Sequence, residues 1–269
     1  MSLTGHVPNA RAARWLNLGA LNRIVVSAVL AGLLAALLLT AVQRFQVSGL
    51  ILQAEVYEEA AARQAAPQTL AARPAHGQPG HDHAHDHLAA AEHEQHEHGG
   101  WQPENGVERT LYTVLANATV GVAFGLLLCA AMSLRGHASG GWRAGLLWGL
   151  AGYAVFFVAP SLGLPPEVPG TQAAPLHDRQ LWWLLTAVCT ASGLAMLVLA
   201  RSWQVKLVGL VLLAAPHLIG APQPALAGSA APAALARSFI YATACANAVF
   251  WLALGGLSGW FYQKFARQA

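Results

Sequence analysis

Residues 24–42 read IVVSAVLAGLLAALLLTAV, a run of 19 residues without a charged side chain. A membrane-spanning helix needs roughly 20 mainly apolar residues to cross about 30 Å of hydrocarbon, so this run predicts one such helix. The rest of the chain has the same character, because 55% of its residues are hydrophobic and only 10% are charged. A soluble core does not require so many long apolar runs. We therefore predict an all-α, polytopic helical bundle in a lipid bilayer.

Further apolar segments extend this pattern along the chain. They are 111–134, 142–164, 181–200, 207–221 and 239–261. The segment 207–221 is short, because 15 residues rise only about 22 Å at about 1.5 Å per residue. Pro216 also removes a backbone donor within it. We expect about six spans, or five if this segment is re-entrant, with residues 111–262 forming the bundle of all spans after the first.

The placement of charges predicts the orientation, since Lys and Arg are retained on the cytoplasmic side of short membrane loops. If six segments cross and the N-terminal segment 1–23 is inside, nine of the 15 basic residues are cytoplasmic and all 12 carboxylates are external. We therefore predict a multi-pass membrane protein with both termini, including the tail 263–269, in the cytoplasm. The basic residues are scattered and form no contiguous basic face, so we expect no nucleic-acid partner.

The external loop 43–110 contains a tract, residues 76–98, with eight histidines and five carboxylates. Imidazole and carboxylate groups bind borderline divalent cations, and the surrounding Pro and Gly residues predict a disordered loop. The candidate metal ligands are His76, His81, Asp82, His83, His85, Asp86, His87, His93, His96 and His98. The alternative is a polar linker with incidental histidines. The tract by itself does not identify the metal, because copper and nickel generally outrank cobalt at such ligands.

Polar residues inside predicted spans are candidates for a transport path, because they are costly in a bilayer and usually face the bundle interior or a cavity. Asn117, His217 and Asn247 lie toward the external ends of their spans. His217 follows Pro216, a pairing that suggests the discontinuous helices of transporters. For the two asparagines, an interhelical hydrogen bond is an equal alternative.

Other sequence features of the predicted spans indicate structural roles and not functional ones. Glycines four residues apart predict seams of close helix packing, and they are Gly121 with Gly125, Gly145 with Gly149, and Gly255 with Gly259. Tryptophans near span ends, Trp182 among them, are typical of the membrane interface. The sequence contains no Walker loop, Ser-His-Asp order or dinucleotide fingerprint. We therefore expect that the protein is not an enzyme and binds no cofactor, and that a divalent metal is its cargo.

Several strings occur together in this chain: QVSGLILQAEVYE at 46–58, GLAGYAVFFVAP at 149–160, LGLPPEVPG at 162–170, RQLWW at 179–183 and APHLIGAP at 215–222. In these strings the chain resembles the CbtA family, from the first span to Tyr262. The resemblance implies cobalt uptake across the bacterial inner membrane, linked to cobalamin synthesis, and a small one-span, histidine-bearing CbtB partner. It also implies about five spans, one fewer than we predict.

Together these observations predict a transporter subunit for divalent cation uptake, in which only the resemblance favours cobalt over nickel or zinc. The tract 76–98 would gather ions outside, and Asn117, His217 and Asn247 would line the entrance. An acidic outer funnel would lie between them, formed by Glu55, Glu58, Glu167 and His177. The alternative is a non-transporting membrane subunit for metal sensing or assembly. The inner half of the predicted bundle is poor in polar residues, which favours this alternative.

Overall fold

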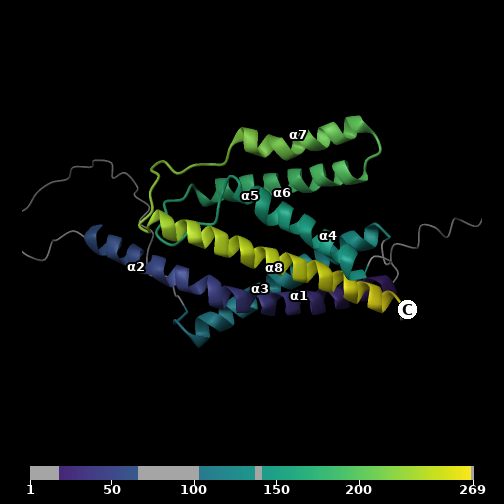
Figure 1. Cartoon of the computed structure of the whole chain (residues 1–269), viewed down its shortest axis with the longest axis horizontal. Coiled ribbons are helices and arrows are strands. Elements are labelled where there is room, and N and C mark those ends of the chain that lie inside the picture. The colour runs from purple at the N-terminus through teal and green to yellow at the C-terminus, as the bar shows by residue number, and fades with distance from the viewer. Residues whose placement is uncertain (1–17, 66–102, 137–140, 268–269) are drawn as a thin grey trace, which may run out of the picture.

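The computed structural model describes residues 18–65, 103–136 and 141–267, and every regular element in these ranges is helical. The elements are α1 (Leu18–Gln46), α2 (Ser48–Ala65), α3 (Val107–Leu134), α4 (Gly141–Tyr153), the π-helical segment η2 (Ala154–Val158), α5 (Ala159–Ser161), α6 (Leu176–Leu199), α7 (Trp203–Ile219) and α8 (Ala233–Ala266). They form an elongated bundle (Figure 1). The predicted all-α fold is confirmed, whereas the tract 76–98 lies outside the described residues.

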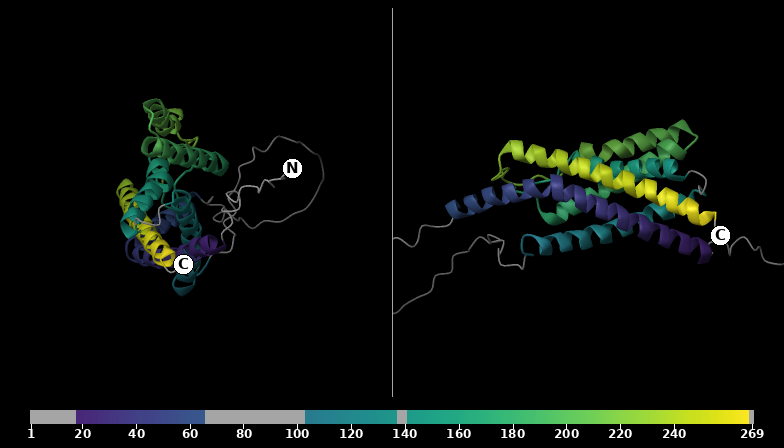
Figure 2. Two further views of the ribbon diagram at one scale, coloured as in Figure 1. Left: turned by 90° about the vertical axis from the view of Figure 1, so that its right-hand side faces the viewer. Right: turned by 60° about the horizontal axis from the view of Figure 1, so that its bottom comes forward.

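Five helices are long and apolar enough to cross a membrane, which makes the chain a multi-pass membrane protein. They are Gly19–Gln46, Val107–Leu134, Gly141–Ser161, Leu176–Leu199 and Ala233–Ala266. The apolar helix α7 is shorter, with 17 residues, and rises about 26 Å. It packs along α6 and remains helical through Pro216, so it is not divided into two half-helices. The start of α1 and the end of α8 lie at the same end of the bundle (Figure 2).

Charges separate along the bundle axis. The described carboxylates all belong to α2, to the turn before α3 or its first turn, to the α5–α6 loop or to the start of α6. These segments meet at one end of the bundle, at the left of Figure 1, which we call the acidic end. The opposite, basic end carries only cations among the described charged residues: Arg23, Arg135, Arg143, Arg201, Lys206, Lys264 and Arg267. The fold therefore has two electrostatically different ends.

Helices pair through glycines that allow their backbones to touch. At each of these glycines an added Cβ would overlap the backbone of the partner helix, so no larger residue fits without a shift. The close pairs are Gly32 with Gly121 between α1 and α3, Gly145 with Gly255 between α4 and α8, and Gly193 with Gly209 between α6 and α7. The predicted glycine seams are confirmed as packing surfaces, and two of them, on α4 and α8, face each other.

Aromatic rings fill the centre of the bundle. Phe124 of α3, Phe156 of η2 and Trp251 of α8 have ring centroids 4.7 to 5.5 Å apart. Trp251 is 2% exposed, and Gly152 leaves room for its indole ring. This cluster connects three helices of the bundle, and it lies beside the π-helical turn in the third span.

The π-helical turn has a local cause. Pro160 has no backbone N–H with which to continue the α-helical pattern. In the preceding turn, the N–H of Ala159 bonds to the carbonyl of Ala154, five residues earlier. The helix thus passes into α5 with a widened turn instead of a break, and this third span ends at Ser161, where we predicted residue 164.

Candidate functional site

The candidate residues of the funnel and entrance all belong to the acidic half of the bundle. Glu55 and Glu58 lie on α2, Glu167 lies in the α5–α6 loop, and His177 is exposed on the first turn of α6. Asn117, His217 and Asn247 lie on α3, α7 and α8. Within the described ranges, no group of three or more His, Cys, Asp or Glu residues could hold a metal ion. The structure therefore brings these candidates to one end without assembling them into one metal site.

An ion pair occupies the carboxylate of Glu55. Arg109, in the first turns of α3, donates from Nη2 to Oε1 of Glu55 at 2.6 Å and from Nη1 to Oε2 at 3.3 Å. Arg109 Nη1 also donates to Oδ1 of Asn105 at 2.7 Å. The pair joins α2 to α3 across 54 residues of sequence, and a cation that bound Glu55 would first have to displace a bidentate guanidinium.

A second ion pair holds Glu167, whose Oε2 accepts a hydrogen bond from Nη2 of Arg179 at 3.0 Å. This pair fixes the α5–α6 loop to the start of α6. Glu58 packs beside Gly170 of the same loop, where φ is +75°, a conformation that favours glycine. Two of the three funnel carboxylates are thus neutralised by arginines, whereas Glu58 and His177 take part in none of the described ion pairs.

Trp182 organises the surroundings of His217. Its Nε1 donates to the carbonyl oxygen of Pro216 at 3.2 Å, and its ring meets the His217 imidazole edge-on, with centroids 6.0 Å apart. Gly163 packs against Cη2 and Cζ2 of the same indole, with no room for a side chain. Trp182 is only 6% exposed, so our assignment of this residue to the membrane interface was wrong. The LGLPP and APHLIGAP strings therefore meet at one buried indole.

The two intramembrane asparagines make different hydrogen bonds. Nδ2 of Asn117 donates to Oγ1 of Thr40 at 2.9 Å and to Oε1 of Gln43 at 2.7 Å, which joins α3 to α1. Asn247 donates to the carbonyl of Thr243 within its own helix, at 3.0 Å. The interhelical bond that we kept as an alternative is thus present for Asn117. A role in the pathway stays a prediction for both residues.

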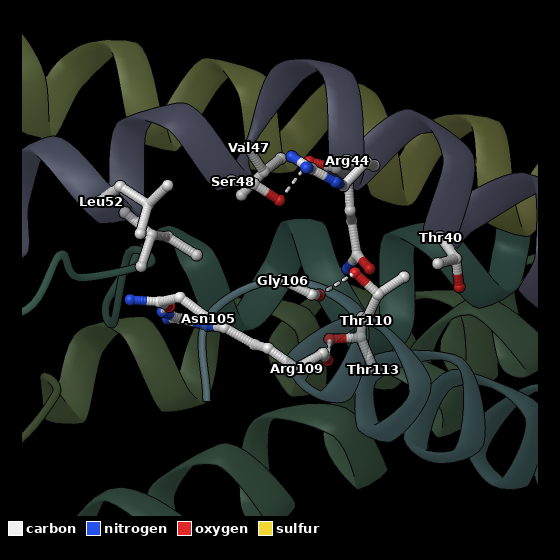
Figure 3. A pocket seen from close by; sticks show the side chains of 12 residues that line it. Thr40, Arg44, Val47, Ser48, Leu52, Asn105, Gly106, Arg109, Thr110 and Thr113 are labelled. Carbon is white, nitrogen blue, oxygen red and sulfur yellow. Dashed lines mark hydrogen bonds between the residues drawn. The ribbon is translucent and has the colours of Figure 1, made fainter. Parts of the chain in front are cut away.

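A pocket of about 220 Å³, lined by both polar and apolar residues, lies between the α1–α2 junction and the start of α3. Figure 3 shows Arg44 and Ser48 on one wall, with Asn105, Arg109 and Thr110 on the other. Thr40 and Gln43, the partners of Asn117, line it as well. Sequence reasoning missed this pocket, because its walls come from segments about 60 residues apart and carry no recognisable motif.

Comparison with known proteins identifies one matching family. A family model described as "Probable cobalt transporter subunit (CbtA)" matches residues 21–263, from the start of the first span almost to the end of α8. No curated protein and no solved structure matches the chain. The matched range includes the residues of both Arg–Glu pairs and of the Trp182 contact. This membrane protein belongs to the CbtA family of probable cobalt transporter subunits.

Proposed function

We propose that this protein is the membrane subunit of a transporter that takes up a divalent cation, with cobalt for cobalamin synthesis as the favoured cargo. The observation that carries the proposal is the family match over residues 21–263. The fold supports it, because a bundle of apolar helices with polar residues gathered toward one end suits a membrane transporter. Nickel or zinc remains the alternative cargo, since no residue geometry here selects one metal.

The acidic end faces outward in this proposal. The positive-inside rule supports that orientation, because the basic end carries seven cations and no carboxylate among the described residues. Both termini are then cytoplasmic in the bacterial inner membrane, and α7 counts as a sixth span. Lys206, near the start of α7, extends the reach of this short helix by placing its ammonium group at the inner interface.

The histidine-rich tract collects metal on the outer side. It falls within residues 66–102, and the flanking helices α2 and α3 have their adjoining ends at the acidic end. Ions gathered there pass to Glu58 and His177, and then to Glu55 and Glu167 as these exchange an arginine for the cation. Asn117, His217 and Asn247 line the entrance. A small one-span CbtB-like subunit completes the transporter.

A second function is a non-transporting subunit for metal sensing or assembly. It is favoured by one specific observation, the lack of any three-residue metal-ligand group in the described ranges. Such a subunit needs the outer tract but no continuous polar path. The two functions differ in whether metal accumulates inside the cell.

Cobalt accumulation tests the proposal directly. The chain is expressed with and without its one-span partner in cells that lack cobalt import, and initial uptake is divided by the amount of membrane-inserted protein.

Deleting residues 76–98 should raise the half-saturating cobalt concentration and preserve the maximum rate, because a collector raises local ion concentration without forming the path. His217→Ala should lower the maximum rate at every concentration. Cells that accumulate no more cobalt, nickel or zinc than the empty-vector control would eliminate transport and favour the sensor.

A further inference from the structure

The pocket between the α1–α2 junction and α3 lies at the level of a membrane surface. Arg23 and Arg44 lie 21 residues apart on α1, which corresponds to about 32 Å at about 1.5 Å per residue and matches the roughly 30 Å hydrocarbon thickness. Charged side chains at such spacing place their heads at the two interfaces. Arg44 lines the pocket, so the pocket opens where lipid phosphate groups lie.

Among the described residues that line the pocket, every charged group is a hydrogen-bond donor. Two guanidinium groups, those of Arg44 and Arg109, line it, and no carboxylate does. The Oδ1 of Asn105 accepts from Arg109, and the Oε1 of Gln43 accepts from Asn117. Both amide oxygens are therefore in use, which leaves the two amide NH₂ groups available to a ligand. Guanidinium and amide N–H groups together suit an oxyanion.

The net charge of the lining comes from Arg44. Glu55 neutralises Arg109 from outside the pocket lining, whereas the exposed Arg44 has no such carboxylate among the described ion pairs. A divalent cation would meet a positive wall here and would be repelled. The pocket is thus separate in chemistry from the proposed cation entrance, although Gln43 connects the two through Asn117.

We propose that this pocket binds a phosphate group, either in the head group of an anionic phospholipid or as free phosphate. Its volume of about 220 Å³ equals that of about seven water molecules at about 30 Å³ each, enough for a phosphate with some of its hydration. The same pocket is lined by Val47, Ile51 and Leu52, which offer apolar surface beside the polar groups. A bound phosphate connects α1 to α3 through Arg44 and Arg109.

Lipid-dependent thermal stability of the purified full-length protein tests this site. Dioleoylphosphatidylglycerol, dioleoylphosphatidylcholine and sodium phosphate are titrated in detergent at constant ionic strength, and the apparent affinity is taken from the shift in Tm. Arg44→Gln should weaken phosphatidylglycerol binding about tenfold, the effect of losing one charged hydrogen bond. Arg237→Gln is the matched control, because Arg237 is an exposed arginine of the acidic end outside the pocket. The affinity of this variant for phosphatidylglycerol should equal that of the wild-type protein.

A second variant keeps the test decisive if Arg44→Gln does not fold. Gln43→Glu keeps an oxygen acceptor for Asn117 but adds a negative charge to the lining, and it should weaken binding similarly. Competition by sodium phosphate would identify free phosphate as a ligand, and phosphatidylglycerol binding without such competition would identify the lipid. Equal loss in the Arg44 and Arg237 variants would overturn the proposal. So would a wild-type protein that responds alike to both lipids and not at all to sodium phosphate.

Discussion

The four-helix core of α1, α3, α4 and α8 and the hairpin of α6 and α7 are packed in different ways. The core has two glycine seams and a shared aromatic cluster around Trp251. The hairpin has one close backbone crossing, at Gly193 and Gly209, and α6 contacts the remaining bundle mainly at η2 and α5. The hairpin and α8 diverge toward the basic end (Figures 1 and 2). One unit is held along its length and the other mainly at one end.

This difference in packing suggests that the four-helix core is a rigid scaffold and that the α6–α7 hairpin is the moving part. Within a bilayer the hydrophobic effect does not drive one apolar helix onto another, so close packing and interhelical hydrogen bonds hold a bundle together. The hairpin has few such contacts with the rest of the bundle, and two of them are Gly163 against Trp182 and Phe156 against Trp183. Trp182 in turn holds Pro216 and His217 of α7. We therefore expect the hairpin to shift relative to the core during transport, with Trp182 as its fixed point.

The largest expected effect is on the core seam. In Gly255→Ala the new methyl group would overlap the backbone of Gly145 and Gly149, and overpacking of this kind typically costs about 1 to 3 kcal/mol. Gly256→Ala is the matched control, because its methyl group meets only the flexible Leu146 side chain. The midpoint of denaturant unfolding in detergent should fall for the first variant and not for the second. Equal midpoints would contradict a rigid core seam.

An intermediate effect is expected at the fixed point of the hairpin. Trp182→Phe removes one donor to the Pro216 carbonyl, which keeps the bond from the Gly220 N–H. The loss of one such hydrogen bond costs about 0.5 to 1.5 kcal/mol. Because the loss falls on the hairpin, proteolysis in the loop 220–232 should increase and uptake per molecule should fall, while the core unfolding midpoint is retained. Trp203→Phe, at an exposed indole on α7, serves as the control. A drop in the core midpoint would show that the hairpin and core unfold together.

The smallest effect is expected at the hairpin crossing. Gly209→Ala would bring its methyl group against the Gly193 carbonyl and the Met196 side chain. Since α7 packs mainly on α6, it can move outward by a few tenths of an ångström, so we expect a cost below about 1 kcal/mol, under the overpacking range of a confined core. The same unfolding measurement compares it with Gly255→Ala. A larger loss for Gly209→Ala would reverse the assignment of scaffold and moving part.

The membrane fold was predictable from sequence because length and apolarity alone determine a spanning helix. The glycine seams were predictable too, since residues four apart share one helix face. The pairing of Glu55 with Arg109 was not, because it depends on how α2 and α3 converge across 54 residues. The burial of Trp182 was not predictable for a related reason. Its position near a span end is typical of an interface residue, and the sequence does not show that α7 packs over it. The metal role of tract 76–98 stays a prediction.

The π-helical turn at Ala154–Val158 sets the rotational phase of the third span. An α-helix turns about 100° per residue, at 3.6 residues per turn, and a π-helical turn holds an additional residue. Without that residue, α5 would rotate by about this angle relative to α4, and Gly163 would face away from Trp182. The hairpin would then lose its contact with the third span, even if every other residue were unchanged. In this part of the molecule, the count of residues matters as much as their chemistry.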